Sequence, residues 1–308
     1  MEFLKNFLCR SFKILPKRKE GKYYMQFTCS EPGNLVYYHQ YPDDREKAGE
    51  TAMDQGREEK LVMELRDQVS DLLSAVQLLT PLVRERGNKQ DGKNLSYLNQ
   101  SLYRLLRTVN HMDITQNSDP IFSPRPVDLG NLCRDVGRQV EGIAPDMGIS
   151  FWWEIDRDGV FSMADGALLE QAILNLLTNA FQHAGSGGHV ELRSALGGGR
   201  FTVTVRDDGP GLIPPDPDAD PLLKRPGGLG LGLEAARRVA SLHGGVLMLE
   251  NENPGVRAIL SLPVHTPTEE EKLRDKGSRF DRTGGFSQLL VEFSPLLPPE
   301  RFTFDDVE

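Results

Sequence analysis

Two runs of apolar residues at helical spacing constrain the fold of this chain more than any other feature. Within each run, neighbouring apolar residues are three or four positions apart, which places them on one face of a helix. The first run is Leu61, Leu65, Val69, Leu72, Val76, Leu79 and Val83, and the second is Leu95, Leu98, Leu102, Leu105, Val109 and Met112. The charged and polar residues 84–93 between them predict a turn, so the two helices form an antiparallel hairpin.

A single hairpin cannot bury both of these apolar stripes. Two copies of the hairpin packed into a four-helix bundle would bury them, because each helix then has a partner on both sides of its stripe. The sequence therefore predicts a homodimer held together by residues 57–115.

A second domain follows a linker at residues 116–125, which contains Pro120 and Pro124. Asp128 is placed to cap a helix that begins near Leu129. Strand patterns alternate with helix patterns in the rest of residues 126–265: strands at 149–155, 189–194, 200–206, 245–251 and 256–262, and a strongly apolar helix at 169–181. This order predicts an α+β domain, a two-layer sandwich with helices on one face of a mostly antiparallel sheet.

The composition of the 308 residues is that of a soluble globular protein, with 38% hydrophobic and 26% charged residues. No apolar stretch approaches the roughly 18 residues that a membrane-spanning helix needs. The formal net charge of −9 disfavours nucleic acid as a partner, because an acidic surface is repelled by phosphates. Three widely spaced cysteines, Cys9, Cys29 and Cys133, form no disulfide framework or metal-binding pair, which is typical of a cytoplasmic protein.

The ends of the chain carry less information. Residues 1–22 are basic and have apolar residues at helical spacing, which predicts a short amphipathic helix. Packing on the next domain is the favoured interpretation, and peripheral contact with an anionic membrane surface is the alternative. The sequence indicates no chemical function for the N-terminal region 1–56 or the C-terminal tail 266–308.

Two near-matches to nucleotide-binding motifs are rejected. Residues 87–94 (GNKQDGKN) approach the P-loop pattern, but they end in Asn94, which lacks the hydroxyl that binds magnesium, and they follow a helix and not a strand. Residues 228–232 (GLGLG) have the wrong glycine spacing and position for a dinucleotide fingerprint.

Three other segments are interpreted together. Asn175 and Asn179 are one helical turn apart and share a face, where amide oxygens suit a hydrated Mg²⁺ that carries phosphates. Asp207 ends a strand and is followed by Gly209 and Gly211, so its carboxylate can accept the amine of adenine while the glycines let the base approach the backbone.

The third segment is the glycine-rich run that contains Gly228, Gly230 and Gly232. It leads into a helix at 234–243, and backbone N–H groups at a helix start form a site for phosphate anions. Each segment alone is also compatible with an ordinary turn or helix surface. Their order along the chain, with a proline-rich stretch before the third, favours an ATP site.

This triplet resembles the N, G1 and G2 boxes of the GHKL (Bergerat-fold) ATP-binding domain, and the hairpin upstream resembles the dimerisation and phosphotransfer region of sensor histidine kinases. The resemblance implies ATP and Mg²⁺ as ligands, with Asn179 on the metal and Asp207 on adenine. The remaining nucleotide-binding positions that it implies are Asn175, Gly209, Gly211, Gly228, Gly230, Gly232 and Lys224. It also implies transfer of the γ-phosphoryl group to histidine in a phosphorelay with a response regulator.

The acceptor position of that family is occupied here by Met63, in the run MELRDQV. A methionine has no nucleophilic nitrogen, and no histidine lies elsewhere in the first helix. His111, near the end of the second helix, is a poor substitute. Three alternatives follow: a degenerate histidine kinase, a kinase that phosphorylates another protein's histidine, and a pseudokinase that binds nucleotide and a response regulator or another histidine kinase without catalysis.

Overall fold

The computed structural model describes residues 13–19, 22–28, 51–85, 89–116, 122–211, 230–268 and 285–303. Contacts divide the chain into two units, Met1–Asp54 and Gln55–Glu308. In the first unit, strand β1 (Lys13–Lys19) pairs antiparallel with β2 (Lys22–Thr28). The predicted N-terminal helix is therefore wrong for Lys13–Lys19, where pairing with the aromatic β2 strand overrides the helical spacing. Residues 1–12, which carry the rest of that prediction, lie outside the described residues.

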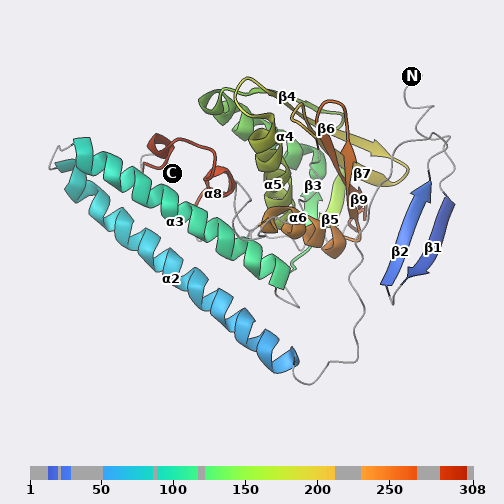
Figure 1. Cartoon of the computed structure of the whole chain (residues 1–308), viewed down its shortest axis with the longest axis horizontal. Coiled ribbons are helices and arrows are strands. Elements are labelled where there is room, and N and C mark those ends of the chain that lie inside the picture. Colours follow the sequence, from blue (N-terminus) through green and yellow to red (C-terminus); the bar gives the residue numbers. More distant parts are fainter. Residues whose placement is uncertain are drawn as a thin grey trace. The chain divides into compact units, whose positions relative to one another are not determined.

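The second unit begins with the predicted helical hairpin, formed by α2 (Thr51–Glu85) and α3 (Lys89–Gln116) (Figure 1). Both helices are longer than predicted, and Lys89–Lys93 belong to α3 and not to the turn. The hairpin buries Val62, Val69, Leu73 and Val76 of α2, and Leu102, Tyr103, Leu106 and Val109 of α3. Several residues of the predicted stripes remain exposed in the single chain: Leu61, Leu72 and Leu79 on α2, and Leu98 and Leu105 on α3.

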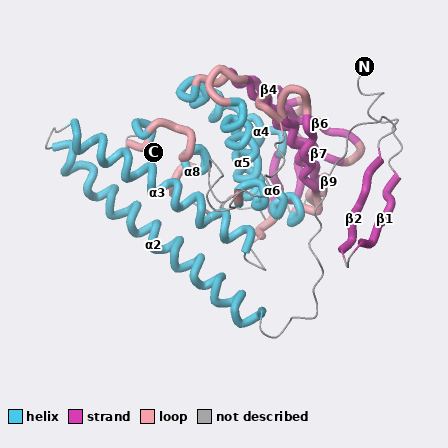
Figure 2. The backbone as a smooth tube through the Cα atoms, in the orientation of Figure 1, coloured by secondary structure: helices cyan, strands magenta, loops and turns pink. Residues whose placement is uncertain are grey.

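An α+β sandwich follows the hairpin, as predicted, and Figure 2 shows its helices and strands in separate colours. Its five-stranded sheet has the order β4-β6-β7-β9-β8, in which only the β4–β6 pair is parallel. The strands of this sheet are β4 (Ser150–Ile155), β6 (His189–Gly197), β7 (Arg200–Asp207), β8 (Val246–Asn251) and β9 (Val256–Pro263). A second sheet, which was not predicted, pairs β3 (Arg125–Asp128) with β5 (Phe161–Ala164).

Three helices pack on one face of the larger sheet: α4 (Leu129–Ile143), α5 (Gly166–Ala184) and α6 (Leu231–Leu242). Burial alternates along β7, where Phe201, Val203 and Val205 point into the core. Helix α5 is buried along most of its length, since it lies between the sheet and the neighbouring helices. The N-cap prediction for Asp128 is confirmed, because its Oδ1 accepts hydrogen bonds from the backbone N–H groups of Gly130 (3.1 Å) and Asn131 (3.2 Å).

The C-terminal segment 285–303 folds back onto the domain, which the sequence did not reveal. It contains helix α8 (Gln288–Phe293) and the short 3₁₀ helix η2 (Pro299–Arg301). A second 3₁₀ turn, η1 (Ala144–Met147), follows α4. The apolar side chains of the C-terminal segment are buried: Phe286, Leu289, Val291, Phe293, Leu297 and Phe302. None of the helices within the described ranges is long and apolar enough to cross a membrane.

Candidate functional site

One face of α5 carries the two predicted amides and continues to a histidine. Asn175, Asn179 and His183 follow one another at intervals of four residues, so they line the same side of the helix. Their exposure rises along the helix: Asn175 is fully buried, Asn179 is half-buried and His183 is exposed. This face connects the other two predicted segments, one at each end.

Asp207 lies at the His183 end, where β7 stops. Its Oδ1 accepts hydrogen bonds from the backbone N–H groups of Gly209 (2.9 Å) and Val256 (3.3 Å). Both bonds use Oδ1, so within the described part of the chain Oδ2 keeps its acceptor sites for a ligand. Burial raises the pKa of Asp207 above its ordinary value, although the two N–H groups and the nearby His183 offset part of this shift.

The glycines around Asp207 are required by close approaches. A Cβ atom at position 209 would lie 2.7 Å from the carbonyl oxygen of His183, and one at position 211 would lie 2.6 Å from Oδ1 of Asn251. Gly211 also has φ of +84°, which disfavours any other residue. Gly255, which the sequence analysis did not select, has φ of +99°, and a Cβ there would overlap the carbonyl oxygen of Asp207.

The glycine-rich segment meets the opposite end of the α5 face. Gly230 is the N-cap of α6 and has a left-handed backbone with φ of 72°. A Cβ at position 232 would lie 2.8 Å from Oδ1 of Asn175, so the start of α6 touches this amide directly. The described residues therefore bring the N-box amide next to the start of α6, and bring Asp207 next to the other end of the same helix face.

Other predicted residues lie apart from this site or outside the described residues. Gly228 and Lys224 fall in the stretch 212–229, which the structure does not describe. Met63, at the expected acceptor position, projects from α2 with 60% of its surface exposed.

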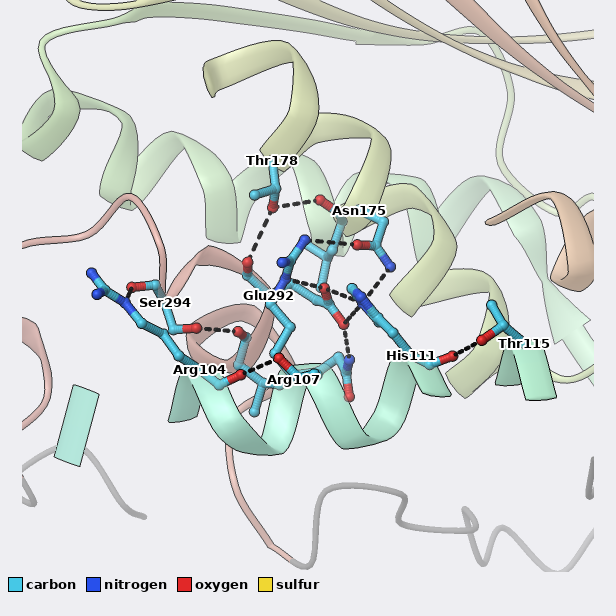
Figure 3. A network of polar contacts seen from close by, with 12 residues as sticks. Arg104, Arg107, His111, Thr115, Asn175, Thr178, Glu292 and Ser294 are labelled. Atoms are coloured by element: carbon cyan, nitrogen blue, oxygen red, sulfur yellow. Dashed lines mark hydrogen bonds and ion pairs between the residues drawn. The ribbon is translucent and has the colours of Figure 1, made fainter. Parts of the chain in front are cut away.

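Asn175 takes part in a buried polar network that the sequence analysis missed (Figure 3). Its Oδ1 accepts a hydrogen bond from Nη2 of Arg107 (3.2 Å), and its Nδ2 lies 3.0 Å from Nε2 of His111. Both partners come from α3. Glu292, from α8, completes the network with Oε2 at 3.1 Å from Nε of Arg107 and 3.0 Å from Nε2 of His111.

Glu292 is fully buried, as is Asn175, and His111 is nearly so. Burial alone would raise the pKa of Glu292, but the charges and hydrogen bonds of His111 and Arg107 outweigh it and hold the pKa below its ordinary value. Glu292 is therefore an anion held between two basic groups. Nothing in the sequence pattern pointed to it, because a lone glutamate in a tail of unknown structure has no predicted neighbours.

The two ends of this site differ in how well they suit a nucleotide. At the Asp207 end, a buried carboxylate faces glycines that leave no room for side chains, an arrangement that fits a purine amine. At the α6 end, the amide of Asn179 is half-buried, whereas Oδ1 of Asn175 accepts from Arg107 and Nδ2 of Asn175 lies 3.0 Å from Nε2 of His111, both on α3. No group of three or more His, Cys, Asp or Glu side chains that could hold a metal occurs within the described ranges.

Sequence comparison places this site in a known family. Residues 164–266 match the family described as "Histidine kinase-, DNA gyrase B-, and HSP90-like ATPase". The adaptive-response sensory kinase SasA of Prochlorococcus marinus (strain MIT 9303) is 31% identical over 157 residues, which cover 47% of this chain and 42% of that protein. The sensor protein RstB of Escherichia coli (strain K12) is 31% identical over 215 residues, which cover 62% of this chain and 47% of that protein. The chain thus spans less than half the length of these relatives.

A solved structure resembles a larger share of the chain. Full-length ShkA, determined in complex with AMPPNP, superposes with a TM-score of 0.54 and 26% sequence identity over 70% of this chain and 47% of that chain. The matched family covers α5, the glycine segments and Asp207, which are the parts of the fold that build the candidate site. Residues 164–266 thus form a domain similar to the ATPase domains of histidine kinases, DNA gyrase B and HSP90.

Proposed function

We propose that this chain is an ATP-binding protein of two-component signal transduction, related to sensor histidine kinases. The proposal rests on one face of α5, which carries Asn175 and Asn179. Gly232 of α6 lies against Asn175, and Asp207 of β7 lies near the other end of this face. In this proposal Oδ2 of Asp207 accepts the exocyclic amine of adenine, and the amide of Asn179 holds the Mg²⁺ that accompanies the phosphates. Gly209, Gly211, Gly228, Gly230 and Gly232 line the nucleotide, and Lys224 contributes charge near the phosphates.

Bound Mg-ATP would supply a transferable phosphoryl group to a partner imidazole, with the metal neutralising charge. This chain does not offer such an imidazole at the usual place, because Met63 occupies it. His111 is a poor alternative, since its Nε2 lies 3.0 Å from the carboxylate of Glu292 and its side chain is buried. These two observations favour the second candidate function, a pseudokinase that binds nucleotide and a partner protein without phosphorylating itself.

We also propose that the protein is a homodimer. Leu61, Leu72 and Leu79 form an exposed stripe along α2, and Leu98 and Leu105 form another on α3. Stripes of this kind on adjacent helices suit a four-helix bundle with a second copy, which would remove them from water. A response regulator or an intact histidine kinase is the proposed protein partner. A cytoplasmic location is proposed, and contact of residues 1–22 with a membrane surface remains the alternative to packing.

Incubation with γ-labelled ATP and Mg²⁺ distinguishes the two candidate functions. The protein is tested alone and with an intact histidine kinase whose own ATP site has been disabled, and direct ATP binding is measured on the same sample. Acid-labile, alkali-stable label on the partner means transfer to another protein's histidine. ATP binding without label on either protein means a pseudokinase, and absence of ATP binding would contradict both candidates.

A further inference from the structure

One face of α3 is occupied by the chain's own C-terminal segment 285–303. Nε2 of Gln100 donates hydrogen bonds to the backbone carbonyl oxygens of Ser294 (3.1 Å) and Leu297 (2.7 Å). Nε of Arg104 also donates to the carbonyl of Ser294 (3.1 Å), and Nδ2 of Asn99 donates to that of Phe302 (2.9 Å). Carbonyl groups that α8 and the turn after it leave unpaired are thus satisfied by side chains of α3.

Aromatic contacts support the same interface. The ring of Tyr103 meets Phe286 edge-on at a centroid distance of 5.7 Å and Phe302 at 5.2 Å. Edge-on pairs at this separation are favourable beyond the area that they bury. Tyr103 of α3 therefore packs against two aromatic rings of the C-terminal segment.

The same segment is anchored on α5. The ring of Phe293 packs against Phe181 of α5 at 5.4 Å, and Oγ1 of Thr178 lies 3.4 Å from the carbonyl oxygen of Glu292. Segment 285–303 thus contacts the nucleotide-binding helix on one side and α3 on the other. Figure 3 shows Glu292 between these two helices.

This arrangement has a direct consequence for Asn175. Its Oδ1 accepts a hydrogen bond from Arg107, its Nδ2 lies against the imidazole of His111, and its side chain has no exposed surface. A side chain without exposed surface cannot contact a hydrated metal or a phosphate. We propose that segment 285–303 is an autoinhibitory clamp, which holds α3 against Asn175 through Glu292 and must release α3 before nucleotide binds. The proposal rests on the proposed function, because it concerns access to the same ATP site.

The interface has the character of a contact that opens. Beside the apolar side chains of segment 285–303, it buries the charged Glu292 and the polar Asn99, Gln100 and His111, and interfaces that open are more polar than permanent ones.

The clamp does not compete with the proposed dimer. Leu105 lies about 140° around α3 from Gln100, because successive residues of a helix are rotated by about 100°. The exposed leucine stripe and the clamped face therefore point in different directions. A second copy can pack on the stripe while the clamp is either closed or open.

Titration of a non-hydrolysable ATP analogue with Mg²⁺, followed by calorimetry, tests the clamp in the full chain. Glu292→Gln removes the buried charge, and Glu300→Gln is the matched control, because Glu300 lies in the same segment but is exposed. The apparent affinity for nucleotide scales with the fraction of molecules in which the clamp is open. If the clamp is closed in nine molecules of ten, Glu292→Gln should raise this affinity about tenfold. Glu300→Gln is expected to bind as the wild type does.

A second variant and a second readout guard against misfolding of Glu292→Gln. Arg104 is exposed, and Arg104→Ala removes one hydrogen bond to the C-terminal segment while the neighbours of Asn175 stay in place. It should therefore raise the affinity for the analogue less than Glu292→Gln does. In the wild type, nucleotide should raise amide hydrogen exchange in residues 285–303. Unchanged or slower exchange there, or unchanged affinity in the folded variants, would overturn the clamp.

The variant Asp207→Asn separates failure of the clamp from failure of the proposed function. If Asp207→Asn weakens binding while Glu292→Gln and Arg104→Ala bind as the wild type does, the clamp is wrong and the ATP site stands. If none of the folded proteins, clamp variants included, binds the analogue, the proposed function is wrong and the clamp falls with it.

Discussion

Nε2 of His111 lies 3.0 Å from Oε2 of Glu292, which joins the second hairpin helix to the C-terminal segment inside the protein. This buried pair reaches the N-box amide as well, because Asn175 lies 3.0 Å from the same imidazole nitrogen. His111, the one histidine in the sequence of the hairpin, thus makes an internal contact. That use argues against a role for His111 as a phosphoryl acceptor.

Replacement of His111 by Gln should destabilise the protein. The fully buried carboxylate of Glu292 would keep Arg107 but lose one of its two basic partners, which costs about 1–3 kcal/mol for a buried group of this kind. Urea denaturation measures the loss, with His265→Gln as an exposed control. An unfolding free energy equal to that of the wild type would contradict the importance of this pair.

Leu72→Glu should convert the dimer to a monomer. Leu72 lies on the exposed α2 stripe with 51% of its surface accessible, and a charge there cannot be buried in a four-helix bundle. Leu78→Glu is the control, because Leu78 is 77% exposed but lies about 120° around the helix from Leu72. Sedimentation should show a monomer for Leu72→Glu and a dimer for Leu78→Glu. A monomeric wild type would contradict the dimer.

Acidification should destabilise the protein through His243. The Nε2 atom of this buried histidine accepts a hydrogen bond from the backbone N–H of Asp165 (3.0 Å), and its Nδ1 lies 2.8 Å from the carbonyl oxygen of Val239. Burial lowers the pKa of His243 from 6.5, so the unfolded chain binds a proton more readily than the folded one. The contribution to stability is complete above pH 6.5 and is lost as the pH falls from there toward the folded pKa.

The slope of that loss is bounded by one proton, which is about 1.4 kcal/mol per pH unit. Urea denaturation at several pH values should show a shallower slope for His243→Gln than for the wild type. His265→Gln, an exposed substitution, should keep the slope of the wild type. Equal slopes for the wild type and His243→Gln would exclude this histidine as the cause.

Asp207→Asn should leave the free protein at least as stable as the wild type near neutral pH. Burial raises the pKa of Asp207, so its ionised form is disfavoured in the folded state, and stability falls as pH rises through the folded pKa. An amide of the same size keeps an Oδ1 acceptor for the N–H groups of Gly209 and Val256. A clear loss of stability would indicate a structural role for the carboxylate and would weaken its assignment to a ligand.

The sandwich was predictable because its elements are defined by local patterns. The alternation of β7 and the apolar face of α5 appear in the sequence with nearly the bounds of the structure, and the cap at Asp128 follows from its place before an apolar period. The glycines beside Asp207 were also found, since close backbone approach demands residues without side chains.

The parts that were missed depend on contacts between distant residues. The burial of Tyr103 and the exposure of Leu98 and Leu105 could not be assigned, because one face of α3 is covered by residues 285–303 and not by the other hairpin helix alone. Glu292 has no local signal, and its role depends on Arg107 and His111, some 180 positions earlier. Gly255 was overlooked because its close neighbour, Asp207, is on a different strand.

The most direct test of the account is a calorimetric titration of a non-hydrolysable ATP analogue with Mg²⁺ into wild type, Asp207→Asn and Asp208→Asn. Asp208 is the matched control, because its exposed carboxylate accepts the backbone N–H of His189 (2.9 Å), a bond that Asn can keep. A hydrogen bond to a charged group is worth about 1.5–3 kcal/mol, so Asp207→Asn should weaken binding by about 10- to 100-fold. Asp208→Asn should bind as the wild type does. Equal affinity for the wild type and Asp207→Asn would contradict a nucleotide site at Asp207.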